Sequence, residues 1–398
     1  MTIQGYRRLK GPDTTPDGYP LPLTMKPITK HSVVVKQEGA ELKQYPETFV
    51  PGKEELGESE MRLTCCGSGN PVVRRAQSAT CWLVELGNGD KFVFDVGGGS
   101  VRNLWSLEIS PAELDKLFLT HLHLDHVGDF HVLYDGLGWA RNSPLRVWGP
   151  SGYTPEQGTA EFCDLMHRAA LWHNESKAGI VPSSGMVIEA NEFDISELTP
   201  DNPSTLVYDE NGVKISAFPV IHCIYGSIGY RLEWNGLSMT FHGDGSPNSF
   251  EAEQAKGVDV MMHEGFIDAE TFSNKSGIPL QITQNVVGEH TTGERFGQLM
   301  QIAKPNLGVA YHYFLDDDVI DPFFELLHQT YDGPVVLAQD LMVINVTPEQ
   351  IVTRLAETNL LHWTPPVPPE KRGDMTLSPR SKSAIPEWVR QTLIEVES

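Results

Sequence analysis

Several features that would assign this chain to a particular class of protein are missing from its 398 residues. No apolar run is long enough to span a bilayer, and the first twenty residues lack the apolar segment of a secretory signal. The five cysteines are few, odd in number and irregularly spaced, which argues against a disulfide framework. They include no CxxC pair, which argues against a cysteine-rich zinc site. These absences favour a protein with reduced thiols that is located in the cytoplasm and has no membrane partner.

Positive charge is also scarce. The chain has 30 Lys and Arg residues against 53 Asp and Glu residues, which gives a formal net charge of −23. Because the phosphate backbone of a nucleic acid is bound chiefly through Lys and Arg, this balance argues against a nucleic acid as a partner. We therefore expect a small-molecule substrate. The hydrophobic content of 40% is that of an ordinary globular protein.

The composition and the periodicity of the sequence change near residue 61. Residues 1–60 are rich in proline, glycine and charge without clear periodicity, and we expect them to form an N-terminal arm. Residues 61–346 alternate β-rich runs with short helical patterns, which predicts an α/β catalytic domain. Within this domain, residues 150–205 form a long insertion with one amphipathic helix at about 159–172. Long irregular segments in compact domains are usually functional or disordered, so this insertion is expected to shape the substrate entrance.

The end of the chain is predicted to be a helical extension over residues 347–398. Its first helix is expected in PEQIVTRLAE, at 348–357, where a Thr-Pro pair precedes an apolar pattern. A stiff proline-rich linker follows, and a last helix is expected at 384–396.

The densest group of potential metal ligands lies in THLHLDH, at 120–126. His121 and His123 alternate along extended backbone, so both side chains can point the same way, and Asp125 and His126 follow on a loop. Imidazoles and a carboxylate that converge on one point suit Zn²⁺ or a similar metal. A lone histidine at a strand end is more often only hydrogen-bonded, but four such groups in six residues predict a metal site.

Three further residues could complete this site. His222 ends the apolar run FPVIH, Asp244 lies in FHGDG, and His312 ends GVAYH. Each lies where a buried strand opens onto a loop, which is the usual place for ligands in α/β folds. Taken singly, each could equally be a hydrogen-bonded histidine or a turn aspartate. Together with the first cluster they fit one site.

This order of motifs resembles the metallo-β-lactamase superfamily of binuclear metallohydrolases over about residues 61–346. The stretches MMHEGF and GEHTTGE are similar to motifs of the ribonuclease Z and arylsulfatase branch. The residue pattern of HLHLDHVGDF is also similar to that of the guanitoxin-biosynthesis-type hydrolase. The resemblance implies an α/β fold of four layers, αβ/βα, in which two mixed β-sheets are flanked by helices. It is also compatible with a homodimer.

The resemblance further implies a role for each of these side chains. It implies two divalent metal ions, with Zn²⁺ favoured and Mn²⁺ or Fe²⁺ as alternatives. One ion would be held by His121, His123 and His222, the other by Asp125, His126 and His312, and Asp244 would bridge them. Asp95 matches the family's structural aspartate beside the site. His290, oriented by Glu264, matches the pair that protonates the leaving group; the alternative is a buried His–Glu hydrogen bond that only fixes the fold.

The chemistry expected from this site is hydrolysis through a metal-bridging hydroxide, with Asp125 also able to accept a proton. The first expectation is a sulfate or phosphate ester of a small organic molecule. The alternatives are a ribonuclease Z-type tRNA 3′ endonuclease, a lactonase or carboxylic-ester hydrolase, and a non-catalytic scaffold. Leu124 and Gly245 stand where ribonuclease Z usually has glycine and threonine, and no basic arm for gripping tRNA is evident, which puts the nuclease reading in doubt.

Overall fold

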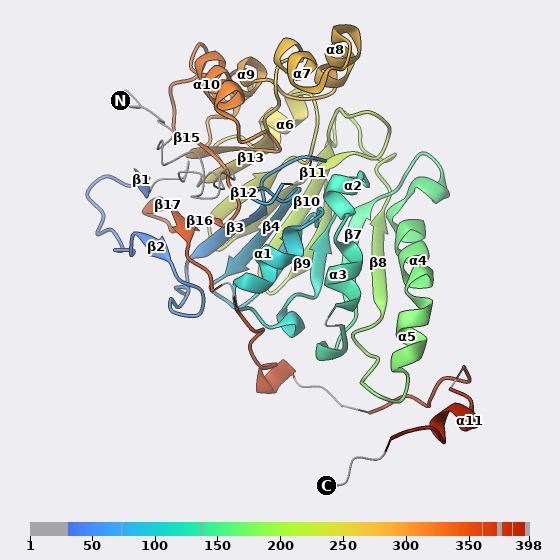
Figure 1. Ribbon diagram of the computed structural model, residues 1–398. Coiled ribbons are helices and arrows are strands. Elements are labelled where there is room, and N and C mark those ends of the chain that lie inside the picture. The colour runs from blue at the N-terminus through green and yellow to red at the C-terminus, as the bar shows by residue number, and fades with distance from the viewer. Residues whose placement is uncertain are drawn as a thin grey trace, which may run out of the picture.

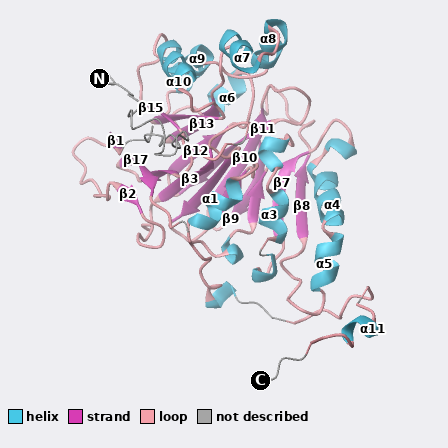
Figure 2. Cartoon of the chain, viewed as in Figure 1, coloured by secondary structure: helices cyan, strands magenta, loops and turns pink. Residues whose placement is uncertain are grey.

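Two mixed β-sheets pack face to face in the computed structural model, and helices cover their outer faces (Figure 1). The structure describes residues 31–72, 74–136, 138–359, 361–371, 376–383 and 385–394. Figure 2 shows the strands at the centre and the helices outside them. The predicted α/β architecture of two mixed sheets flanked by helices is therefore confirmed.

The first sheet runs in the order β1-β17-β16-β3-β4-β5-β6-β7-β8, and β2 pairs with β17. Its strands are β1 (Ser32–Val35), β2 (Thr48–Phe49), β3 (Met61–Gly67), β4 (Cys81–Leu86), β5 (Lys91–Phe94), β6 (Lys116–Phe118), β7 (Leu145–Pro150), β8 (Ile188–Phe193), β16 (Met342–Val346) and β17 (Gln350–Ala356). The helices that follow or precede these strands are α1 (Ser100–Ser106), α2 (Leu124–Val127), α3 (Phe130–Asp135), α4 (Thr159–Ala169) and α5 (Leu171–Lys177).

The second sheet runs in the order β15-β14-β13-β12-β11-β10-β9. Its strands are β9 (Thr205–Glu210), β10 (Val213–Pro219), β11 (Ile228–Trp234), β12 (Leu237–Phe241), β13 (Val260–Glu264), β14 (Leu307–Tyr311) and β15 (Val335–Leu337). The helices on its side are α6 (Ser249–Gln254), α7 (Ala269–Ser276), α8 (Leu280–Gly288), α9 (Gly293–Ala303) and α10 (Asp317–Leu327), and α11 (Glu387–Arg390) lies near the C-terminus (Figure 1).

Large apolar side chains fill the space between the two sheets. Phe118 stacks on Trp148 with ring centroids 4.7 Å apart, and the edge of Tyr230 packs against Phe118 from the opposite sheet. Such aromatic pairs contribute packing energy beyond the area that they bury. The core therefore fixes the two sheets relative to each other, and with them the loops at their edges.

The direction of the strands places the candidate site residues at one edge of the two sheets. β5 and β6 run parallel in the first sheet, and β12, β13 and β14 run parallel in the second. β10 also runs in the direction of β12, because each is antiparallel to β11. The candidate side chains come directly after the carboxyl ends of these strands, where ligands usually bind in open α/β sheets.

The C-terminal prediction is wrong in its first element. The segment predicted as a helix at 348–357 contains strand β17, which pairs antiparallel with β16 from Met342↔Leu355 to Val346↔Ile351. Its apolar residues are β-branched at Ile351 and Val352, and nearly the whole strand is buried, so pairing overrides the helical spacing. Among the described residues 385–394, the last helix is also shorter than predicted, since α11 spans only Glu387–Arg390. Residues 384, 395 and 396 of the predicted helix lie outside the described residues.

The insertion contains more regular structure than predicted. Its helix is divided into α4 and α5, and β8 adds an edge strand to the first sheet by pairing parallel with β7. Part of the N-terminal arm, residues 1–30, lies outside the described residues; β1 and β2, in the described part of the arm, pair with β17. The division into arm, catalytic domain and extension stays a proposal. Within the described residues, no helix has the length and apolar character needed to cross a membrane.

Candidate metal centre

Three histidines form the first ligand group. His121 and His123 follow β6 and His222 follows β10, and their imidazole nitrogens converge. His123 Nδ1 lies 3.0 Å from His121 Nε2 and 3.2 Å from His222 Nε2. Two nitrogens bound to one tetrahedral zinc ion at about 2.05 Å would be about 3.3 Å apart, so the spacing suits a shared cation. Burial lowers the pKa of His121 well below its ordinary value, which favours the neutral imidazole that binds metal.

The second ligand group consists of one carboxylate and two histidines. Asp125 and His126 come from α2, and His312 follows β14 with a left-handed backbone (φ 63°). His312 Nε2 lies 3.0 Å from Asp125 Oδ2, and His126 Nε2 lies 3.7 Å from the same oxygen. All three side chains are buried. Their ligand atoms and one from Asp244 lie within 4.8 Å of one another.

Asp244 belongs to both groups. Its Oδ2 atom lies 3.2 Å from His126 Nε2 and 3.0 Å from His312 Nε2. Its Oδ1 atom and His126 Nε2 are both buried without a hydrogen-bond partner of good geometry. Because an unpaired buried polar atom is costly, these two atoms indicate that something else satisfies them. The seven residues therefore fit a pair of divalent cations that share Asp244.

Buried polar contacts hold the ligands in place. Asp95 follows β5 in a left-handed conformation (φ 54°) and accepts hydrogen bonds from His126 Nδ1 at 2.7 Å and from Thr120 Oγ1 at 2.8 Å. A partner on the far nitrogen of a ligating histidine fixes the orientation of its ring. Gly243 allows Asp244 to approach, since a Cβ atom on this residue (φ +64°) would lie 2.8 Å from the Thr120 side chain.

His290 and Glu264 form a pair beside the second group. His290 Nδ1 lies 2.8 Å from Glu264 Oε2, which is also 3.3 Å from His312 Nδ1, and Gly245 N donates to Glu264 Oε1 at 2.6 Å. The ring of His290 stacks on Phe266 at 4.1 Å. Burial alone would lower the pKa of His290, but the Glu264 carboxylate raises it above its ordinary value. This is an environment in which a histidine can hold and release a proton.

A buried cluster around Glu251 lies close behind the site, and the part that Glu251 plays in it was not predicted. His242, two residues before Asp244, packs with Glu251 of α6 and His263 of β13. His263 Nε2 lies 3.1 Å and His242 Nδ1 3.4 Å from Glu251 Oε2. Glu251 lies in the polar segment SFEAEQ, whose composition suggests an exposed helix, so no local signal marks it as buried.

Comparisons with known proteins identify the family of the segment that carries the first cluster. Residues 74–142, which include the first cluster, match the family described as Metallo-beta-lactamase superfamily. The chain carries a metallo-β-lactamase superfamily domain. It is a hydrolase of that superfamily, whose fold implies the binding of divalent metal.

Curated relatives in the superfamily include ribonuclease Z of Mycobacterium marinum, 26% identical over 72% of this chain and 99% of the relative. Ribonuclease Z of Mycobacterium avium is 28% identical over 72% of this chain and 98% of the relative. Among solved structures, the short form of human tRNase Z has a TM-score of 0.53 and 19% identity, and covers 71% of this chain and 98% of that chain. The metallo-beta-lactamase fold protein YhfI of Bacillus subtilis has a TM-score of 0.51 and 14% identity, and covers 72% of this chain and 100% of that chain.

These relatives overturn the prediction about partners. The net charge of −23 argued against a nucleic acid and for a small-molecule substrate, but the curated relatives are ribonucleases, which act on RNA. The physical reason is that net charge averages over the whole surface, whereas binding depends on the charge close to the site. The cations implied at the metal centre also add positive charge that a residue count leaves out.

Proposed function

We propose that this chain is a metal-dependent ribonuclease of the ribonuclease Z type, which hydrolyses a phosphodiester bond at the 3′ end of precursor tRNA. The observation that carries the proposal is the His290–Glu264 pair beside two groups of metal ligands that share Asp244. The ribonuclease Z relatives support it, since the matched region spans nearly their whole length.

In this proposal, His121, His123 and His222 would hold the first ion, Asp125, His126 and His312 would hold the second, and Asp244 would serve both. The many imidazole ligands favour Zn²⁺. When bound, the two cations would acidify a water molecule and neutralise the charge that grows on the phosphoryl oxygens.

The chain's own residues handle the protons. Hydrolysis forms a bond from the oxygen of water to phosphorus and breaks the bond from phosphorus to the ribose oxygen, which then needs a proton. The His290 ring lies between the rings of His222 and His312, with centroids 5.1 and 5.6 Å away. With Nδ1 held by Glu264, its Nε2 atom is free to donate that proton. Asp125 accepts the proton that the attacking water loses.

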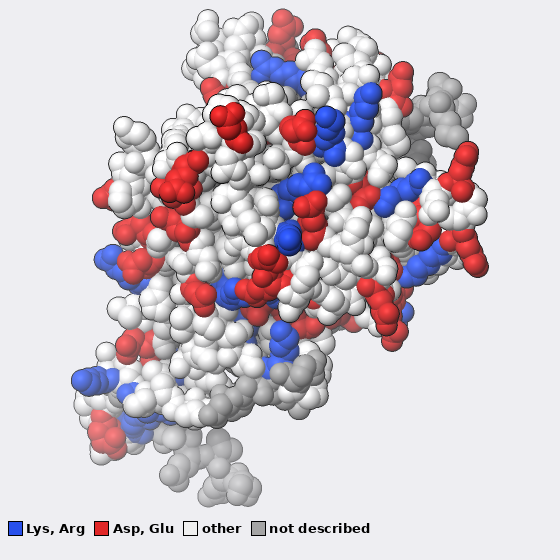
Figure 3. Space-filling model, turned by 180° about the vertical axis from the view of Figure 1, so that it is seen from behind, with Lys and Arg blue, Asp and Glu red and all other residues white. Residues whose placement is uncertain are grey.

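Basic side chains are present on the surface, and one of them lies beside the site. On the face seen in Figure 3, Lys and Arg side chains lie interspersed with the acidic ones. Close to the site, Arg295 contacts the backbone oxygens of Gly288 and His290 at 3.4 and 3.2 Å. A guanidinium group in this position can contact a phosphate of a bound strand.

The test is incubation of the metal-loaded protein with a precursor tRNA that carries a 3′ extension, followed by mapping of the cut. The proposal expects one endonucleolytic cut near the junction between tRNA and trailer. An unstructured RNA of equal length and charge is the control for general nuclease activity. Failure to cut the precursor at any metal loading would overturn the proposal.

A further inference from the structure

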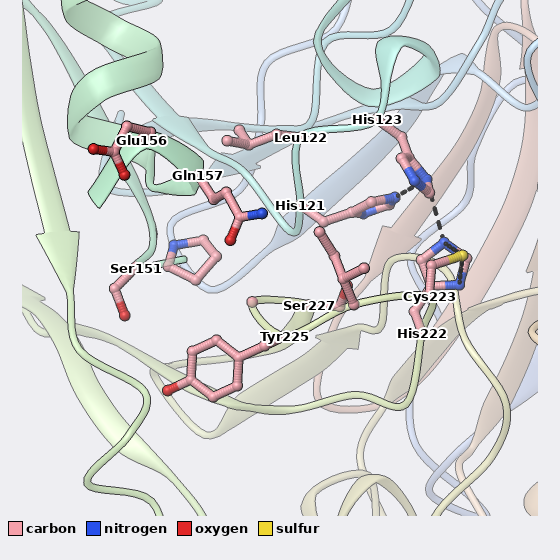
Figure 4. A pocket seen from close by; sticks show the side chains of 13 residues that line it. His121, Leu122, His123, Ser151, Glu156, Gln157, His222, Cys223, Tyr225 and Ser227 are labelled. Carbon is pink, nitrogen blue, oxygen red and sulfur yellow. Dashed lines mark hydrogen bonds between the residues drawn. The ribbon is translucent and has the colours of Figure 1, made fainter. Parts of the chain in front are cut away.

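A cavity of about 290 Å³ opens beside the first ligand group (Figure 4). Its walls come from three separate segments: the histidines after β6, the start of the insertion at 150–157, and the loop at 222–227 after β10. His121, His123 and His222 line both the cavity and the metal group. The cavity is therefore continuous with the place where the reacting phosphate must lie.

The lining disfavours a negatively charged group. None of the thirteen described residues around the cavity is Lys or Arg, and Glu156 would repel a phosphate. Apolar surface comes from Leu122, Ile224 and Tyr225. Hydrogen-bonding capacity comes from uncharged groups, chiefly the Gln157 amide, which points toward His121 in Figure 4. A flat, neutral group with polar edges suits this lining.

Tyr225 supplies an aromatic surface at the mouth. Its side chain is 41% exposed, and its ring is supported by an edge contact with Tyr153, with centroids 6.4 Å apart. The loop that carries it approaches the insertion closely, since a Cβ atom on Gly226 (φ +117°) would lie 3.2 Å from the Ser151 carbonyl oxygen. The insertion and the loop after β10 therefore form opposite sides of one small recess.

We infer that this cavity receives the base and ribose of the nucleotide next to the scissile phosphate, an inference that rests on the proposed function. The nucleoside attached to the scissile phosphate must lie next to the metal centre. The recess begins at the histidine ligands of that centre, so it is in the right place to receive this nucleoside. The volume is at the lower limit of small-molecule sites, which suits one nucleoside and not a longer segment. Stacking on Tyr225 would tolerate any base, because every base has an aromatic face.

The test uses three precursor RNAs: one intact, one with an abasic nucleotide directly 5′ of the cut and one with it directly 3′. For the wild-type protein, one of the abasic substrates should lose roughly 10-fold in kcat/KM, as expected for one lost stacking contact. Ile224→Trp fills the recess, so its kcat/KM on intact RNA should be about as low as that of the wild type on this abasic substrate. For this variant, kcat/KM on the abasic substrate should be no lower than on intact RNA. Ile302→Trp on α9 is the matched control, because both isoleucines are 65% exposed.

Bound metal and thermal midpoint should match the wild type in both tryptophan variants, and Tyr225→Ala provides a second variant that removes the stacking surface. The inference alone is overturned if the wild type cuts all three substrates with equal kcat/KM, or if Ile224→Trp and Tyr225→Ala both behave as the wild type. If the wild type cuts no RNA, the proposed function fails, and the inference fails with it.

Discussion

His290 Nδ1 lies 2.8 and 3.0 Å from the two carboxylate oxygens of Glu264, which is the last residue of β13. The carboxylate is fully buried, while the imidazole reaches the edge of the site. Such a contact fixes the proton of Nδ1 toward the carboxylate and leaves Nε2 as the nitrogen that faces the site. In the proposed function, this pair supplies and orients the proton donor beside the metal groups, and neither residue is one of the seven proposed ligands.

His290→Ala is expected to keep both metal ions but to lose rate. Without the donor, kcat on RNA should fall about 100-fold or more, because the ribose oxygen is a poor leaving group. The loss should be much smaller on bis(p-nitrophenyl) phosphate, whose phenolate leaves without a proton. Full activity of the variant on RNA would contradict the proton-donor role.

Asp244→Ala should lose metal as well as turnover, because this carboxylate is within reach of both ligand groups. Metal content by mass spectrometry should fall from about two ions per chain to fewer than one. Asp164→Ala, on the exposed side of α4, is the control and should keep the full content. Two tightly bound ions in the Asp244 variant would show that the shared carboxylate is misassigned.

Asp95→Asn tests the support behind the ligands. Asp95 accepts from His126 Nδ1 at 2.7 Å, so the substitution removes the charge that orients this ring. We expect roughly 10- to 100-fold weaker metal affinity in competition with a chelating dye, with the fold retained. An unchanged affinity would mean that Asp95 only fixes the backbone turn.

Glu251→Gln should destabilise the fold in a pH-dependent way. Burial opposes ionisation of Glu251, but its close contacts with His242 and His263 lower its pKa below the ordinary value. Burial also opposes ionisation of His263, but Glu251 raises the pKa of this histidine. Stability from Glu251 is present above its ordinary pKa and is lost as pH falls through the lowered value. Stability from His263 is full below its ordinary pKa and is lost as pH rises through the raised value. The contribution is therefore greatest between about pH 4.5 and 6.5.

Urea unfolding of the metal-loaded protein measures this effect. The variant should lose about 3 kcal/mol relative to wild type at pH 5.5 and less at pH 9. Burial lowers the pKa of His242 to about 4, so this histidine lowers the free energy of unfolding at acidic pH. The effect is similar in the wild type and in the variant, and it therefore largely cancels in the difference between them. Glu253→Gln, exposed on the same helix, is the matched control. An equal loss at both pH values would contradict the charged pair.

Much of the site was predictable because its signals are local. His121, His123, Asp125 and His126 lie within six residues, and the period of an extended strand explains how two of them point together. His222, Asp244 and His312 each follow an apolar strand, and parallel strands end at the same edge of a sheet. Taken singly, each of these three could equally have been a hydrogen-bonded histidine or a turn aspartate. Together with the first cluster they fitted one site, and the resemblance implied their individual roles.

The features that were not predicted depend on distant contacts. The spacing of QIVTRLA fits a helix until β16, β1 and β2 are placed beside it, and only the sheet makes it a strand. Glu251 is buried because two histidines from other segments meet it. The preference for a small-molecule substrate failed because net charge carries no information about which charges lie near the site.

The most direct test of the account is single-turnover cleavage of a 3′-extended precursor tRNA during titration of the metal-free protein with Zn²⁺. The account predicts that the rate of cutting near the junction rises until about two ions are bound per chain, and that Asp244→Ala stays inactive throughout. Cleavage that needs no divalent ion, or a wild-type protein that binds two ions and leaves the precursor intact, would contradict it.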